Sequence, residues 1–113
     1  MILVETITVD ELRAMAERMF EPLVKGVVDV AERVLVVDAE LHADEEYFLL
    51  EEGSEQENLW GINLWPEFAG TDKFIEFDSM INIRPSQNNR SRGVEDPAIR
   101  ETIRQIVTEK VNG

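Results

Sequence analysis

The sequence predicts a single α+β domain, residues 1–113, with an antiparallel or mixed sheet and helices packed on one face. Three observations predict this class. Segments that alternate apolar and polar side chains, as strands do, are interspersed with segments whose apolar residues recur at helical spacing. Two of the helical segments begin with recognisable capping residues. The chain has 113 residues, 43% of them hydrophobic, which suffices for one domain with its own core.

The first half of the chain is predicted to run strand, helix, strand, strand. Residues 2–6 are short, apolar and β-branched, which favours a strand. Thr8 and Glu11 have the spacing of a capping box and predict the start of a helix. Residues 23–30 are rich in valine and predict a second strand. Residues 34–43 alternate completely and predict a third strand, joined to the second as a hairpin.

The second half is predicted to run helix, strand, strand, helix. Residues 44–52 favour a helix that begins with several acids. Residues 59–65 and 74–84 both alternate and predict strands, the second of them long. Asp96 and Pro97 are typical of an N-cap and first helical position. The predicted order is therefore β-α-β-β-α-β-β-α, and we expect the uncovered sheet face to join copies of the chain in a homo-oligomer.

The composition excludes several classes of protein. The chain carries 24 acids against 11 Lys and Arg, and its net charge of -13 repels nucleic acid and anionic membranes, so we expect neither as a partner. It has no cysteine, which excludes disulfides, thiolate zinc sites and cysteine nucleophiles. No apolar run reaches the length of about 18 residues that a membrane span needs. The first residues lack the basic region of a signal peptide, so we expect a cytoplasmic protein.

One segment, residues 79–94, contradicts this acidity because it contains no Asp or Glu; we call it the Arg–amide segment. Guanidinium groups bind carboxylates and phosphates through paired hydrogen bonds, so we expect a site for a small anionic ligand or an acidic protein partner. The predicted binding residues are Asn82, Arg84, Asn89, Arg90 and Arg92. In the alternative interpretation these arginines neutralise acids of the protein itself, such as Glu76 and Asp78.

A second candidate site lies at the end of the predicted strand 34–43. Polar residues occupy every second position there, in the order Asp38, Glu40, His42 and Asp44. On a strand they would share a face at spacings of about 6–7 Å, where they could bind a divalent cation or transfer protons. This predicts a metal-assisted hydrolase or lyase with His42 as the base and Asp44 or Asp78 as metal ligand or orienting group. A solvated strand face is the alternative, and no cofactor motif is present.

Residues 34–72 contain 11 acids and no Lys or Arg. Such a surface could receive a basic protein, as an antitoxin-like or inhibitor partner does, or could simply be solvated.

Three long strings within residues 40–100 resemble a family of small prokaryotic proteins that is described only as a domain of unknown function. The strings are ELHADEE, GSEQENLWGINLWPE and FIEFDSMINIRPSQNNRSRGVEDPAIR. The span that contains them covers more than half of the chain, and the resemblance implies membership of the family without implying an activity. We therefore favour a small acidic binding or regulatory domain over an enzyme.

Overall fold

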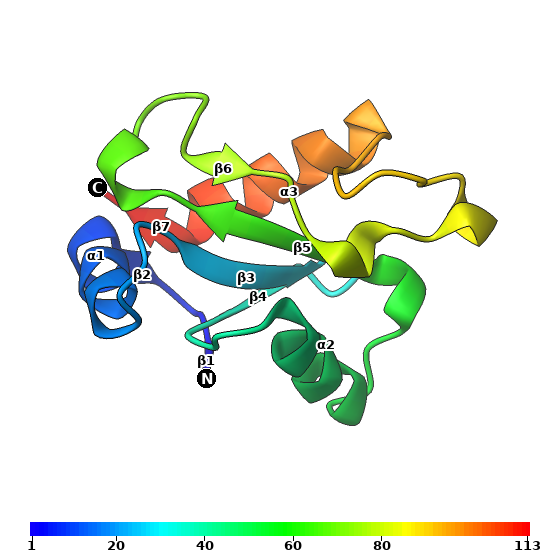
Figure 1. The fold of residues 1–113 in the computed structure, drawn as a ribbon, viewed down its shortest axis with the longest axis horizontal. Coiled ribbons are helices and arrows are strands. Elements are labelled where there is room, and N and C mark those ends of the chain that lie inside the picture. Colours follow the sequence, from blue (N-terminus) through cyan, green and yellow to red (C-terminus); the bar gives the residue numbers. More distant parts are fainter.

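A central antiparallel sheet and three helices form the fold in a computed structural model that describes residues 1–113 (Figure 1). The α+β class is thereby confirmed. The sheet has the strand order β1-β4-β3-β5-β6. These strands are β1 (Ile2–Leu3), β3 (Val24–Asp29), β4 (Val34–Val37), β5 (Leu59–Leu64) and β6 (Ile75–Glu76). A separate parallel pair consists of β2 (Ile7–Thr8) and β7 (Val111–Asn112). The helices are α1 (Val9–Arg18), α2 (His42–Glu51) and α3 (Pro97–Lys110).

Helices cover both faces of the sheet, so the prediction of a single covered face is wrong. α1 and α3 pack on one face over the larger core, and Figure 1 shows α3 behind the strands. α2 packs on the other face, where Leu49 meets a smaller core that includes Val27 and Val36. The physical reason is that the central strands are apolar on both sides: the neighbours Val27 and Val28 point to opposite faces and are both fully buried.

The helix ends follow the capping signals of the sequence. At α1 the Thr8 hydroxyl accepts from the Glu11 amide at 3.0 Å, and the Glu11 carboxylate accepts from the Thr8 amide in return. At α3 the Asp96 carboxylate accepts from the Ala98 amide at 2.8 Å. α2 starts two residues earlier than predicted, without a capping side chain, and ends before Gly53, whose φ of +100° suits glycine. None of the helices has the length and apolar character needed to cross a membrane.

The strand predicted over residues 34–43 is too long. β4 forms the expected antiparallel hairpin with β3, with Val27 opposite Val36, but it ends at Val37. Asp38 then adopts a left-handed backbone with φ of +73°, which turns the chain away from the sheet. The alternation that continued through residues 38–43 therefore belongs to a turn and to the start of α2.

The strand predicted over residues 74–84 is also too long, because the observed strand ends at Glu76. Only Ile75–Glu76 pairs with β5, and the chain then runs irregularly through two single-turn 3₁₀ helices. The Asn82 side chain takes the place of a strand partner: its Oδ1 accepts from the Gly61 amide at 2.8 Å and its Nδ2 donates to the Gly61 carbonyl at 2.9 Å. One side chain thus satisfies the β5 backbone that a longer strand would otherwise have satisfied.

Candidate functional site

Two buried amides fix the shape of the Arg–amide segment. Asn82 is fully buried and, besides its bonds to Gly61, donates to the Arg92 carbonyl at 2.9 Å. Asn89 is 3% exposed, and its Nδ2 donates to the carbonyls of Asn82 and Gly93, both at 2.8 Å. Both carboxamides are therefore engaged inside the protein.

Arg84 fastens the same segment to the start of β5. Its guanidinium donates to the Leu59 carbonyl at 2.6 Å and to the Gln56 carbonyl, and it lies 4.2 Å from the centre of the Trp60 ring. The residue is 9% exposed, and burial lowers the pKa of Arg84 while Glu46 raises it. Arg84 thus holds its own chain together, and its prediction as a ligand contact stays a prediction.

Arg90 and Arg92 are the exposed arginines of the segment. Arg92 Nε donates to Asp78 Oδ1 at 2.5 Å, which is the internal pairing that the sequence analysis gave as an alternative. The Arg90 guanidinium has no hydrogen bond or ion pair. The backbone amides of Arg90 and Ser91 donate to Glu95 Oε2 at 2.6 and 2.9 Å. These amides hold the pKa of the Glu95 carboxyl below its ordinary value, so a carboxylate of the protein itself occupies the anion position that the loop backbone creates.

A second polar cluster lies on the α2 side of the sheet. Lys25, Asn63 and Glu76 are neighbours across β3, β5 and β6. Asn63 Nδ2 donates to Glu76 Oε1 at 2.8 Å, and Trp65 Nε1 reaches the same oxygen at 3.3 Å. Asn63 is 6% exposed, and no group meets hydrogen-bond geometry at its Oδ1. The face predicted to be uncovered and polar is thus covered here by side chains of the same chain.

His42, the first residue of α2, joins this cluster. Its Nε2 lies 2.8 Å from the Ile62 carbonyl, and because a carbonyl oxygen can only accept, we assign the proton of the neutral ring to Nε2. Burial is the main cause that lowers the pKa of His42, and Lys25 lowers it further, whereas Asn63 and Asp78 raise it. The structure therefore brings His42 within electrostatic reach of Asp78.

The other members of the predicted polar row are dispersed. Asp38 lies in the turn after β4 and pairs with Arg18 at 3.4 Å. Glu40 follows in the same turn, where its backbone carbonyl accepts from Lys25 Nζ at 2.8 Å. Asp44 is exposed on the first turn of α2. No three His, Asp or Glu side chains lie close enough together to hold a metal ion.

Glu45 is a notable residue that the sequence analysis missed. It is fully buried on the inner face of α2, and neither carboxyl oxygen has a hydrogen-bond partner. Burial raises the pKa of Glu45 to about 10, although the Ala39 backbone and Lys25 oppose this shift. The carboxyl group is therefore neutral at pH 7. Its position four residues before the buried Leu49 was a usable signal, because residues at that spacing share a helix face.

The family model described as protein of unknown function (DUF5674) matches residues 1–110. The chain belongs to this family. The match extends well beyond the strings at residues 40–100 and covers all elements of the DUF5674 domain up to the end of α3. No curated protein and no solved structure matches the chain.

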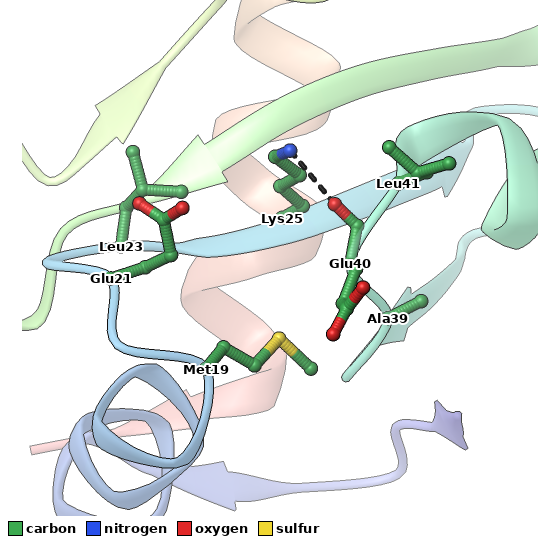
Figure 2. A pocket seen from close by; sticks show the side chains of 7 residues that line it. All are labelled: Met19, Glu21, Leu23, Lys25, Ala39, Glu40 and Leu41. Atoms are coloured by element: carbon green, nitrogen blue, oxygen red, sulfur yellow. Dashed lines mark hydrogen bonds between the residues drawn. The ribbon is translucent and has the colours of Figure 1, made fainter.

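The DUF5674 domain also has a surface hollow of about 330 Å³ between the end of α1, the start of β3 and the turn before α2 (Figure 2). It is lined by Met19, Glu21, Leu23, Lys25, Ala39, Glu40 and Leu41. Figure 2 shows Lys25 reaching across to the Glu40 backbone, while the Glu40 carboxylate extends towards Met19. This hollow could not be predicted from the sequence, because its walls come from three separate segments.

Proposed function

We propose that this DUF5674 domain is a small binding or regulatory domain that holds an acidic group on Arg90 and Arg92. The observation that supports this most directly is the unpaired guanidinium of Arg90 on an exposed, acid-free segment. In this proposal Asn82, Arg84 and Asn89 do not contact the ligand. Their hydrogen bonds to backbone carbonyls hold the segment in place before a ligand binds. A segment that is already ordered loses less conformational entropy on binding.

The pairing of Arg92 with Asp78 is compatible with this role. Both side chains are about half exposed, at 54% and 43%. Exposed ion pairs contribute only about 0–1 kcal/mol, so a carboxylate or phosphate that engages both arginines can replace Asp78 at little cost. The net charge of -13 repels free anions at long range, which favours ligands that make paired, short-range contacts.

A thermal-shift screen with phosphate, nucleotides and carboxylic acids tests the proposal. An anion at about 100 times its dissociation constant adds about 2.7 kcal/mol of stability, which raises the melting temperature by several degrees. We expect this shift for the wild type and not for an Arg90→Ala, Arg92→Ala double variant. Arg13→Ala is the matched control, because Arg13 is an exposed arginine that forms an ion pair with Asp10, and both residues lie on α1 rather than on the Arg–amide segment. An anion that stabilises the double variant as much as the wild type binds elsewhere and contradicts the proposal.

A hydrolase or lyase is the second candidate, and the half-buried, neutral imidazole of His42, whose pKa Asp78 raises, favours it. A neutral imidazole with a nearby carboxylate is suited to act as a general base, a role that contributes about 10²–10⁴ in rate. The test is turnover of p-nitrophenyl esters and phosphates by the wild type and by His42→Asn and Asp78→Asn. Asp44→Asn tests the other acid that was predicted to orient His42. Because Asp44 lies exposed on α2, we expect this variant to keep the wild-type rate. Equal rates in the wild type and His42→Asn would exclude this mechanism.

A further inference from the structure

Phe20 adopts an unfavourable backbone conformation, although its side chain buries almost no apolar surface against the rest of the chain. It is 96% exposed, the most exposed of the large hydrophobic side chains, and its φ is +56°. The residue follows the C-cap of α1, where its amide donates to the Glu17 carbonyl at 3.1 Å and the Glu21 amide donates to the Ala16 carbonyl at 3.0 Å. Glycine usually occupies this position, because other residues in the left-handed region are strained. A strained and exposed aromatic side chain indicates a contact outside the chain.

The hollow of Figure 2 adjoins Phe20, because the residues on either side of it, Met19 and Glu21, both line that hollow. Its apolar wall includes Leu23 and Leu41, and Leu41 is 55% exposed. The hollow and Phe20 together therefore expose apolar surface that the folded chain leaves uncovered.

Glu21 also lines a second depression, of about 200 Å³, in which acidic side chains outnumber basic ones. The second depression adds Glu17 and Glu67, and its one basic side chain, Arg13, pairs with Asp10. The cations near the first hollow are engaged within the chain, since Lys25 donates to the Glu40 carbonyl and Arg18 pairs with Asp38. We call the two hollows, which share Glu21, the groove; its first hollow has an apolar wall and its second is mainly acidic.

We propose that this groove docks a basic segment of a partner protein. A large apolar side chain of the segment enters the first hollow beside Phe20, and a neighbouring Lys or Arg meets Glu17, Glu21 and Glu67 in the second. The charge of the domain supports this occupant, because a net charge of -13 attracts basic segments and steers their approach. The same charge disfavours a second copy of the chain, which would bring two acidic surfaces together.

Selection from a displayed library of random peptides against the wild-type domain tests the proposal. We expect enriched peptides to carry Lys or Arg beside a large apolar residue, and fluorescence polarisation of a synthetic copy to show affinity that falls with salt. Phe20→Gly and Glu21→Lys should each weaken binding at least about tenfold, as loss of an interface anchor does. Tyr47→Ser is the control, since Tyr47 is an aromatic on α2 with 64% exposure.

Phe20→Gly should retain or raise the melting temperature, so its loss of binding cannot be assigned to unfolding. Amide shifts at Met19, Phe20 and Leu41 on peptide addition would place the peptide in the groove. Failure to enrich any peptide, enrichment of acidic peptides, or equal affinity for the wild type and Phe20→Gly would overturn the proposal. So would a wild-type dimer in light scattering that Phe20→Gly converts to a monomer, because the groove would then hold a second copy.

Discussion

Replacing Glu45 by glutamine should stabilise the protein, and the gain should grow as the pH rises. Glu45 is fully buried without hydrogen-bond partners, and its pKa in the folded chain is about 10, against an ordinary value of 4.5. A raised carboxyl pKa means that the folded state keeps a proton which the unfolded state releases above pH 4.5. Folding is therefore unaffected by this group below pH 4.5 and increasingly disfavoured as the pH rises towards 10.

The size of the effect follows from the two pKa values. Each pH unit between them costs the wild type about 1.4 kcal/mol, so the cost at pH 7 is about 3 kcal/mol. Glutamine resembles the protonated acid in shape and stays neutral, and it escapes this cost. The free energy of unfolding of Glu45→Gln minus that of the wild type should be near zero at pH 4.5 and about 3 kcal/mol at pH 7.

Urea unfolding of both proteins between pH 5 and pH 8 measures this difference. Other acids titrate as well, but they contribute equally to both curves, so the difference isolates Glu45. Asp44→Asn removes an exposed acid from the same helix. Its free energy of unfolding should differ from that of the wild type by the same amount at every pH in this range. If the difference for Glu45→Gln is also the same at every pH, Glu45 ionises normally in the folded protein and water or a cation must reach it.

Three further results are expected. Asn82→Ala should lower the free energy of unfolding by about 3 kcal/mol, because it leaves the buried amide and carbonyl of Gly61 without partners; a loss under about 1 kcal/mol in urea unfolding would contradict its role. Gly61→Ala should lower it by about 1–3 kcal/mol, since the new methyl group would lie 2.5 Å from Ser79 Cβ, and Ser79→Gly in the same chain should restore most of the loss. The pKa of His42, followed by NMR, should lie below 6.5 and fall further in Asp78→Asn, because Asp78 raises it; an upward shift in that variant would show that the two groups do not interact.

Features that depend on neighbouring residues in the sequence were predicted well. The capping box of Thr8 and Glu11 and the Asp96 N-cap mark true helix starts because their hydrogen bonds span only two or three residues. The β3–β4 hairpin also followed from local patterns. Predictions failed where a distant contact decided the outcome. Residues 77–84 alternate like a strand, but the bonds from Asn82 to Gly61 on β5 hold them as an irregular segment.

In the candidate site, too, local features could be predicted from the sequence and features set by distant contacts could not. The absence of acids in residues 79–94 is a local property that the sequence shows directly, and two of the three arginines there, Arg90 and Arg92, are exposed. Which of its polar groups are free depends on partners elsewhere, and Arg84 meets carbonyls at the start of β5 that no spacing rule connects to it. Glu45 was missed because it stands among exposed acids, and only the helix orientation shows that it faces the sheet.

The parallel pairing of β2 with β7 has a consequence for how the chain folds. This pair joins segments from opposite ends of the sequence, and α3, directly before β7, supplies Ile103, Ile106 and Val107 to the larger core. The β3–β4 hairpin has a short connection, and β5 pairs with the other edge of β3 once α2 has been synthesised, so these strands and α2 can assemble before α3. On the opposite face α1 supplies part of the core, but the part that Ile103, Ile106 and Val107 cover stays exposed to solvent until α3 has been synthesised. An unfinished chain that lacks α3 therefore exposes apolar strand surface, and such surface is prone to aggregation.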